Sequence, residues 1–372
     1  MRRLTGRVRS YAWGSHTVLA ELTGRSAPTH EPEAELWLGA HEAAPALLDD
    51  TTLDQIIAAD PARTLGADLA ARTGDRLPFL LKVLAPERAL SIQCHPDARQ
   101  ALDAAPGTYT DRSPKPEAVV PLTPFEMFAG MVPYDEIVAR FGSLGVPELR
   151  AIARESLTAH DILAGILATP VDARPDLVER TLAALDGAHA VPADVADAVR
   201  SVALDYPGDV GLVVLLTMHH RVEAPGTYVF VPAGVLHAYV RGAAIEILAN
   251  SDNVVRAGLT PKKIDVAELL RIVQVHRQMV AEVGERVGRV VRYPQSAQEF
   301  SLSLVDQGEE PAQVAETGPR IVLALGGSVR VTCDGEALTL CPGQAVFVEA
   351  AEGALSFTGT GTAYVAATGR PA

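Results

Sequence analysis

The spacing of apolar residues changes twice along the chain. Up to about residue 130, short runs rich in Val, Leu and Phe alternate with turn residues, as in LPFLLKVL (77–84), and predict mostly strands. Between 134 and 218, apolar residues recur every three or four positions between Pro and Gly, as in PELRAIARESL (147–157), which predicts helices. After 219 the strand pattern returns. We therefore expect a mainly β protein with a helical insertion.

Two later segments refine this expectation. The apolar run VGLVVLLTM (210–218) fits either a buried helix or a buried strand, because periodicity does not separate them. PKKIDVAELLRIVQV (261–275) predicts one helix within the second β region. From about 290 to 366, short strands between glycine turns predict an all-β end of the chain.

A faint internal repeat links the two β regions. PGTYVFV (225–231) and PGQAVFV (342–348) share five of seven residues, a turn followed by an apolar strand. Antiparallel jelly-roll barrels are built from such short strands and glycine turns. The first copy leads to His237, whereas the second is followed by EAAEGALSF without a histidine. Only the first copy is therefore expected to bind a metal.

Length and charge narrow the class of protein. A chain of 372 residues has room for two or three domains. Its formal net charge of -14 repels phosphate backbones and anionic lipids, which disfavours nucleic acid and membrane partners. The longest apolar run, 210–216, is far shorter than the roughly 20 residues of a membrane span, and the basic start lacks a signal-like apolar stretch. We expect a cytoplasmic protein.

Cysteine and lysine usage adds two further points. Cys94, Cys333 and Cys341 form no C-x-x-C pair and are expected to be reduced core thiols. Of 32 basic residues only four are lysines, at positions 82, 115, 262 and 263. Because arginine cannot lose its proton, a lysine kept in such a background is a candidate for chemistry, with chance and coding bias as the alternative.

The segment LSIQCHPD (90–97) places polar residues on one face of a strand. Alternation directs Ser91, Gln93 and His95 to one side and Cys94 to the other. An amide oxygen and an imidazole on one face make half of a metal site. The alternative is a buried histidine that is satisfied by hydrogen bonds alone.

The tripeptide Lys115-Pro116-Glu117 offers a carboxylate beside an ammonium. Pro116 biases Lys115 toward extended backbone, so Lys115 and Glu117 project to the same side, unless the tripeptide is only a surface turn. Together with Gln93, His95 and His237, Glu117 completes a set of two imidazoles, one carboxylate and one amide. Such a set is a credible divalent metal shell.

Other charged residues lie close to this set in the sequence. Lys82 is inside the apolar strand LPFLLKVL, where an ammonium must either reach the surface or point into a polar cavity. The stretch EILANSDNVVRAGLTPK (246–262) is dense in polar groups, which suggests a site, although turn chemistry is the simpler explanation for Ser-Asp-Asn. Its polar residues include Glu246, Asp252, Asn253, Arg256 and Lys262.

Long motifs in this chain closely resemble those of the type I mannose-6-phosphate isomerases. They are HAYVRGAAIEILANSDNVVRAGLTPK (237–262), YAWGS, ELWLGAH, LPFLLKVL, LSIQCHPD and KPE. The resemblance covers about 10 to 275 and extends loosely over the C-terminal β region. It implies a cupin (jelly-roll) catalytic barrel from 1–133 and 219–285, a helical insertion at 134–218, and a second, cupin-like β domain at 286–372.

The resemblance also implies the roles of individual residues. Its metal ligands are Gln93, His95, Glu117 and His237, binding one Zn²⁺ per chain, and its active-site arginine is Arg256. Ser91, Lys82, Lys115, Lys262 and Trp13 line the substrate cavity. The general base is left open among Lys115, Lys82 and Glu246, and burial that lowers a lysine pKa suits the two lysines.

Two departures from the family pattern stand out. Ser113 and Pro114 replace the Asn-His that the family usually has before Lys-Pro-Glu, so no proton relay through that histidine operates here. Leu248 replaces a usual Met, which is a packing change.

The implied reaction is the interconversion of mannose 6-phosphate and fructose 6-phosphate through an enediol(ate), by a monomer. One alternative is a cupin non-haem iron oxygenase, since two histidines and a carboxylate also bind iron. The other is a non-catalytic sugar-phosphate sensor.

Overall fold

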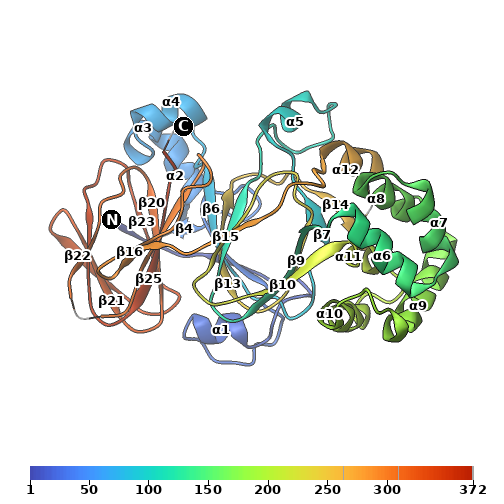
Figure 1. Cartoon of the computed structure of the whole chain (residues 1–372). Helices are drawn as coiled ribbons and strands as arrows, with labels where there is room; N and C mark the ends of the chain where they lie inside the picture. Colours follow the sequence, from blue (N-terminus) through green and yellow to red (C-terminus); the bar gives the residue numbers. More distant parts are fainter. Residues whose placement is uncertain (263, 309, 371–372) are drawn as a thin grey trace.

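Two antiparallel sheets form the middle of the molecule (Figure 1). The computed structural model describes residues 1–262, 264–308 and 310–370. The smaller sheet has the order β10-β9-β12-β7-β14 and the larger the order β15-β11-β8-β13-β6-β3-β2. In the smaller sheet the strands are β7 (Ile92–Cys94), β9 (Phe125–Met131), β10 (Met218–Glu223), β12 (His237–Arg241) and β14 (Val255–Gly258). In the larger they are β2 (Arg7–Arg9), β3 (Glu35–Leu38), β6 (Phe79–Leu84), β8 (Glu117–Pro121), β11 (Tyr228–Val231), β13 (Ala244–Ala249) and β15 (Val280–Glu282).

Strand β9 shows why these sheets pack as they do. Phe125 and Met127 are buried in a core shared with residues of the larger sheet such as Leu84 and Val119. Phe128, on the opposite face of β9, packs instead into the core of the helical insertion. Alternate residues thus serve two cores, because successive side chains point to opposite faces. Apart from Glu126, the strand is apolar for this reason.

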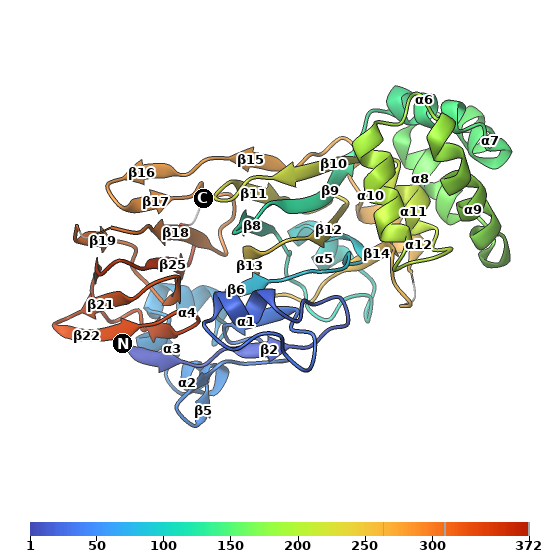
Figure 2. The same ribbon diagram turned by 90° about the horizontal axis from the view of Figure 1, so that it is seen from below.

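The C-terminal residues form a second pair of antiparallel sheets. A seven-stranded sheet has the order β1-β23-β20-β25-β18-β17-β16 and a four-stranded sheet the order β19-β24-β21-β22. Their strands are β1 (Arg2–Leu4), β16 (Glu285–Val287), β17 (Val290–Arg292), β18 (Ser301–Val305), β19 (Ala312–Val314), β20 (Arg320–Leu325), β21 (Val329–Cys333), β22 (Glu336–Leu340), β23 (Ala345–Val348), β24 (Leu355–Thr358) and β25 (Thr362–Ala367). Figure 2 shows these strands continuing the stack of the central ones. The division of the chain at 134, 219 and 286 stays a proposal, and β1 crosses it by pairing with β23.

The helices between residues 134 and 215 gather at the end of the molecule opposite the C-terminal sheets (Figure 1). They are α6 (Tyr134–Leu144), α7 (Pro147–Glu155), α8 (Ala159–Leu167), η1 (Val171–Ala173), α9 (Arg174–Ala184), η2 (Leu185–Gly187), α10 (Ala193–Ala203) and α11 (Gly211–Leu215). The ambiguous run 210–218 is thus mostly helix, and its last residue, Met218, begins β10. The predicted later helix is α12 (Val266–Ile272). No helix in the described ranges has the length and apolar character that crossing a membrane requires.

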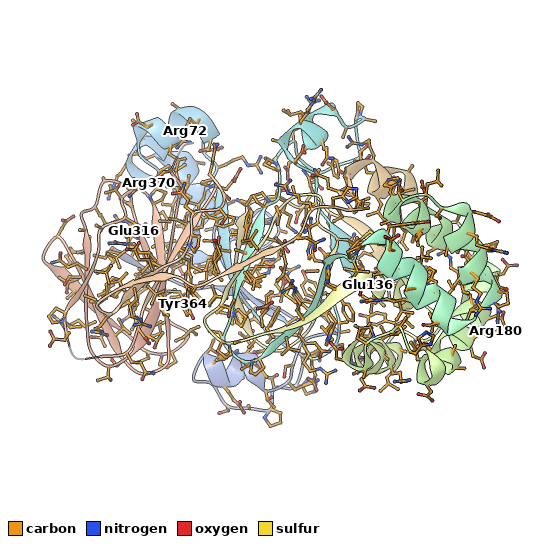
Figure 3. The ribbon with its side chains drawn as sticks, viewed as in Figure 1. Arg72, Glu136, Arg180, Glu316, Tyr364 and Arg370 are labelled. Carbon is orange, nitrogen blue, oxygen red and sulfur yellow. The ribbon has the colours of Figure 1, made fainter. Side chains whose placement is uncertain are left out.

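Arginine side chains on these helices form ion pairs and hydrogen bonds that stabilise the helical part. Arg180 on α9 pairs with Glu148 on α7 at 2.8 Å, and Arg140 on α6 pairs with Glu136 at 2.6 Å. The buried Arg140 guanidinium also donates to the carbonyl of Leu216 at 2.9 Å, just before β10 begins. Figure 3 labels Arg180 and Glu136 on this helical part.

The prediction of mostly strands before residue 130 is wrong in several places. This region contains α1 (Val18–Leu22), α2 (Leu53–Ala59), α3 (Pro61–Thr64), α4 (Ala67–Thr73) and α5 (Ala98–Asp103), besides the short β4 (Leu47–Leu48) and β5 (Thr51–Thr52). Leu53 and Ile57, four positions apart, are the buried face of α2, and the Asp60 carboxylate caps α3. Cys94 and Cys333 are buried as expected, but Cys341 is exposed.

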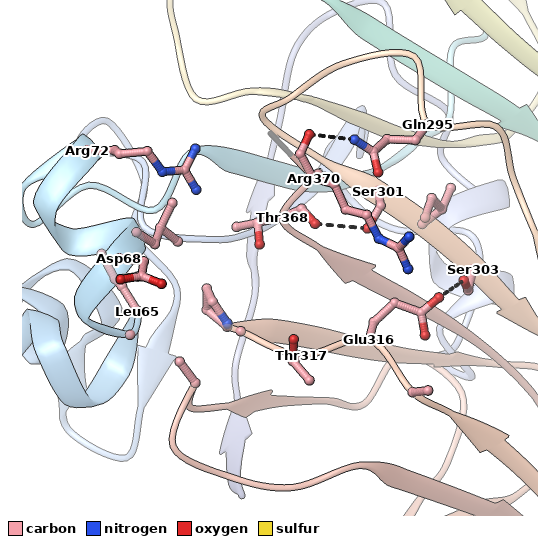
Figure 4. Close-up of a pocket in the computed structure, with 18 of the residues that line it drawn as sticks. Leu65, Asp68, Arg72, Gln295, Ser301, Ser303, Glu316, Thr317, Thr368 and Arg370 are labelled. Atoms are coloured by element: carbon pink, nitrogen blue, oxygen red, sulfur yellow. Dashed lines mark hydrogen bonds between the residues drawn. The ribbon is translucent and has the colours of Figure 1, made fainter. Parts of the chain in front are cut away.

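A cavity of about 830 Å³ lies between α4 and the C-terminal strands (Figure 4). Its lining includes Arg72 of α4, Ser301 of β18, Glu316, Thr368 and Arg370. The Glu316 carboxylate accepts a hydrogen bond from Ser303 at 3.0 Å. None of the site residues predicted from the sequence lines this cavity, so the candidate site lies elsewhere.

Candidate active site

Three predicted ligands meet where two neighbouring strands of the smaller sheet, β7 and β12, face the start of β8 in the larger sheet. His95 follows β7, Glu117 begins β8 and His237 begins β12. Their side-chain donor atoms all lie within 4.8 Å of one another, and each residue is only 2% exposed. Among the described residues, no other histidine, cysteine, aspartate or glutamate joins this group. We call these residues the His-Glu-His cluster.

Hydrogen bonds to backbone carbonyls fix both imidazole rings. His95 Nδ1 lies 2.9 Å from the Asn253 carbonyl oxygen, and His237 Nδ1 lies 3.0 Å from that of Val235. Because a carbonyl only accepts, each Nδ1 carries the hydrogen, and the Nε2 of a neutral ring presents a lone pair. Burial, together with the charge of Lys115, lowers the pKa of His95 to about 4, so this ring is neutral at pH 7.

Both Nε2 atoms face the Glu117 carboxylate. His237 Nε2 lies 2.9 Å from Oε1, and His95 Nε2 lies 3.1 Å from Oε2. The His95 Nε2 is buried and has no hydrogen-bond partner among the described residues. A lone pair against a carboxylate oxygen needs a cation to stabilise it. Two imidazole nitrogens and one carboxylate oxygen are a donor set that suits zinc, so the residues present fit this metal.

The fourth predicted ligand, Gln93, lies next to the cluster. In the register of the sheet, Gln93 of β7 is opposite His237 of β12 on one side and opposite Arg256 of β14 on the other. This register places amide, imidazole and guanidinium in one row across three strands. The Arg256 side chain is half-buried and makes no hydrogen bond or ion pair within the described residues.

Tyr239 is a functional residue that the sequence analysis missed. Its hydroxyl is buried and donates to Glu117 Oε1 at 2.8 Å. The hydrogen bond holds the carboxylate in place, as the outer partners of metal ligands commonly do. Tyr239 is two residues after His237 on β12, so strand alternation places both side chains on one face. The sequence His237-Ala238-Tyr239 could therefore have indicated that Tyr239 lies beside the metal ligands.

Lys115 and Lys82 have opposite electrostatic environments. Lys115 Nζ lies 3.9 Å from Glu117 Oε2, which agrees with the two side chains projecting to one side. Burial holds the pKa of Lys115 below its ordinary value, although Glu117 opposes this effect. Burial alone would also lower the pKa of Lys82, but the charges of Glu246 and Glu35 outweigh it and raise that pKa. The expectation of a lowered pKa is therefore wrong for Lys82.

Lys82 points into a buried polar network rather than to the surface. Its Nζ lies 3.1 Å from Glu246 Oε2, 3.6 Å from Glu35 Oε1 and 4.8 Å from the centre of the Trp37 ring. Trp37 Nε1 donates to Glu35 Oε2 at 2.5 Å. Burial raises the pKa of Glu246, which shares the single Lys82 ammonium with Glu35. Glu35 and Trp37, in ELWLGAH, were not singled out from the sequence.

Replacing Lys82 with Met is expected to destabilise the fold by about 3–5 kcal/mol at pH 7, because two carboxylates lose their buried cation. Urea unfolding measures this change. Because the folded-state pKa of Lys82 is raised, the ammonium's contribution is complete at pH 7 and is lost only as the pH rises through that pKa. Unchanged stability of Lys82→Met would show that the network contributes nothing to the fold.

The three remaining predicted residues lie outside the His-Glu-His cluster. Ser91 is partly buried just before β7, and Lys262 is exposed, with its backbone N–H donating to Thr260 Oγ1 at 3.1 Å. Trp13 is partly buried and stacks on Tyr11, with 5.6 Å between ring centres. Within the described residues, none of their side chains contacts the cluster by a hydrogen bond or ion pair.

A histidine outside the cluster, His220, lies between two carboxylates and provides a contrast. His220 Nε2 lies 3.1 Å from Glu126 Oε1, and His220 Nδ1 lies 3.0 Å from Asp194 Oδ2. The hydrogen bond to Glu126, with that to Asp194, raises the pKa of His220, and two flanking carboxylates favour a ring that donates from both nitrogens. No lone pair is then left for a metal.

These two sites provide a matched pair of variants. His237→Ala is expected to lose bound zinc while the barrel stays folded, because the neighbours Leu236 and Ala238 remain buried in the core. His220→Ala should keep its zinc. Mass spectrometry measures the zinc content, and circular dichroism measures whether the barrel stays folded. Equal zinc content in His237→Ala and the unaltered protein would remove His237 from the metal shell.

The sheets and the cluster together define a cupin protein with a site for one metal ion. Residues 1–134 match the family model described as phosphomannose isomerase type I, catalytic domain. The mannose-6-phosphate isomerase of Salmonella typhimurium is 31% identical over 97% of this chain and 98% of its own length. Mannose-6-phosphate isomerase 1 of Arabidopsis thaliana is 29% identical over 94% of this chain and 89% of its own.

Solved structures agree with these relatives. The apo form of the Salmonella typhimurium enzyme superposes with a TM-score of 0.87 at 31% identity, and 99% of each chain is covered. A mannose 6-phosphate isomerase structure bound with zinc and yttrium has a TM-score of 0.87 at 30% identity, with the same coverage. The chain belongs to the type I mannose-6-phosphate isomerase (phosphomannose isomerase) family.

Proposed function

We propose that this protein interconverts mannose 6-phosphate and fructose 6-phosphate, moving a proton between C1 and C2 of the sugar through an enediol(ate). The observation that carries this proposal is the His-Glu-His cluster, in which two imidazole lone pairs face one buried carboxylate inside a family of sugar-phosphate isomerases. The barrel supplies the dry, fixed setting in which such groups act strongly.

One zinc ion per chain is the proposed cofactor, held by His95, Glu117, His237 and Gln93. When bound, it polarises the sugar carbonyl and stabilises the negative charge that develops on oxygen. Tyr239 keeps Glu117 oriented toward it, and the carbonyls of Asn253 and Val235 keep both rings in the ligating tautomer.

The remaining residues have separate proposed roles. Lys115, buried beside Glu117, holds or moves the proton, since burial lowers its pKa and so favours the neutral amine that can accept a proton. Arg256 supplies a permanent positive charge toward the developing oxyanion. Lys82 and Glu246 form an ion pair, which makes them weaker candidates for the base than Lys115. Ser91, Lys262 and Trp13 are proposed to bind the phosphate and the sugar.

A coupled assay for fructose 6-phosphate formation, with and without a chelator, tests the proposal. Turnover that depends on metal is the expected result. The comparisons support the isomerase rather than the two alternatives. Oxygen consumption with iron and no isomerisation would instead indicate an oxygenase, and sugar-phosphate binding without turnover would indicate a sensor.

We further propose that the enzyme acts as a monomer in the cytoplasm, without a nucleic acid partner. The net charge of -14 supports the last point, because it repels phosphate backbones.

A further inference from the structure

One hydrogen-bonded cluster joins the segment before Glu117 to the segment after β13. The Asp111 carboxylate accepts hydrogen bonds from Ser113 N at 2.7 Å, Ser251 Oγ at 3.0 Å, Asn253 Nδ2 at 3.2 Å and Asp252 N at 3.3 Å. We call Asp111, Ser113, Ser251 and Asn253 the Asp-Asn latch. The latch connects residues about 140 positions apart in the sequence.

Asn253 carries the connection to the metal ligands. This residue is 1% exposed, and its Nδ2 donates to the carbonyl oxygens of Asp111 and Ser113, each at 2.9 Å. Its own carbonyl oxygen accepts the hydrogen bond from His95 Nδ1 at 2.9 Å. The residue that holds the segment therefore also fixes the tautomer and the angle of the His95 ring.

The segment lacks secondary structure, and outside the latch it is held by a hydrogen bond from Tyr109 to Glu268 and by one from the Ala249 N–H to the Pro116 carbonyl at 3.0 Å. Residues 104–116, between α5 and β8, form no helix or strand. Pro114 and Pro116 have no N–H to donate, so the backbone beside Lys115 cannot form a continuous ladder. The hydrogen bonds at Asp111 and Ser113 end two residues before Lys115 and four before Glu117.

We propose that Asp111 and Asn253 are positioning residues that align His95 and Glu117 for metal binding and place Lys115 beside them. The inference rests on the proposed zinc site and explains how that site stays ordered. The latch residues do not themselves ligate the metal. In this chain, Ser113 and Pro114 fill the positions of the family's Asn-His. The latch contacts Ser113 only through its backbone N–H and carbonyl, so these hydrogen bonds do not depend on the identity of its side chain.

The experiment compares zinc affinity and folding stability in variants of the full chain. Metal-stripped Asp111→Ala and Asn253→Ala are titrated with zinc against a chromophoric chelator, and their metal-free forms are unfolded thermally. The matched control is Asp161→Ala. The Asp161 carboxylate also accepts three hydrogen bonds, from Leu157 N, Thr158 N and Thr158 Oγ1, but in the exposed cap of α8.

Zinc Kd is expected to rise by up to about 10- to 100-fold in each latch variant, the range for loss of an outer partner of a metal ligand, because both variants keep the residue 253 carbonyl but lose the side-chain contacts that hold it in place. Asp161→Ala should lower stability and leave the zinc Kd unchanged. The zinc Kd of the double variant should be about equal to the larger Kd of the two single variants, because both residues act through the same contacts. Asp111→Asn, which keeps the shape and one acceptor, covers the case in which Asp111→Ala does not fold, and a smaller rise in Kd is expected.

Latch variants that unfold more readily but bind zinc as tightly as the unaltered protein would overturn the proposal. The latch would then stabilise the loop without positioning the metal ligands. Fully additive losses in the double variant would also overturn it. An unaltered protein that binds no zinc would instead contradict the proposed function, so the two failures are distinguishable.

Discussion

Stripping the metal is expected to lower kcat/KM for mannose 6-phosphate by about 10³-fold or more, and adding zinc should restore it. Lewis-acid stabilisation of a developing oxyanion contributes several kcal/mol, and about 4 kcal/mol corresponds to a factor of 10³. No other described group in the cluster supplies this charge, because both imidazoles donate from Nδ1 to backbone carbonyls and present Nε2 to Glu117, which is an anion. Dialysis against a chelator followed by stepwise zinc addition measures the effect.

The buried His95 Nε2 predicts a further property of the stripped protein. Without a cation, two lone-pair acceptors face each other across 3.1 Å at no more than 2% exposure. Metal-free protein should therefore gain stability on zinc addition, by RT ln(1 + [Zn]/Kd). His220→Ala, whose altered histidine lies outside the cluster, should respond to chelator and zinc like the unaltered enzyme. Full turnover in verified metal-free protein would refute the metal-dependent mechanism.

Part of the His-Glu-His cluster could be predicted, because its residues lie in the short motifs LSIQCHPD, KPE and HAY. Alternation in LSIQCHPD puts His95 opposite Cys94, and the structure buries Cys94 in the helical core while His95 faces Glu117. The same alternation rule would have found Tyr239 from His237. Which side chains share a face depends on spacing along one strand, which a sequence shows directly, whereas the meeting of β7, β8 and β12 was implied by the family resemblance.

The Lys82 network was not predictable in the same way. Lys82 is opposite Glu246 on β13 and opposite Trp37 on β3, and this register follows from the pairing of three strands. The register is set by packing over the whole barrel, so no local pattern reveals which carboxylate meets the ammonium. The raised pKa of Lys82 follows from that pairing, and it is why this lysine differs from Lys115.

The early helices were missed for a different reason. Helices α2 to α4 are four to seven residues long, so each offers one turn or two of periodicity. Such short patterns overlap with those of strands, and tertiary packing decides between them. The long insertion helices, with 9 to 11 residues each, had enough turns to be read.

Lys115→Arg is expected to lower kcat by about 10²- to 10⁴-fold and to leave KM comparatively unchanged, if Lys115 moves the proton. Arginine keeps the positive charge beside Glu117 but cannot deprotonate at accessible pH. If Lys115 only binds the phosphate, the same change mainly raises KM. Steady-state kinetics of the zinc-loaded variant separates the two roles.

The bulkier guanidinium creates one rival explanation, because Lys115 Nζ is only 3.9 Å from Glu117 Oε2 and the lysine side chain is 12% exposed. Displacement of Glu117 would imitate a catalytic loss, so zinc content must equal that of the unaltered enzyme. Lys262→Arg is the matched comparison: that lysine is exposed, lies outside the cluster and is proposed to bind the substrate, so its replacement should change KM rather than kcat. A zinc-replete Lys115→Arg enzyme with normal kcat would exclude proton transfer by Lys115. Since the ion pair holds Lys82 protonated, the base would then have to be sought first at Glu246, whose pKa burial already raises.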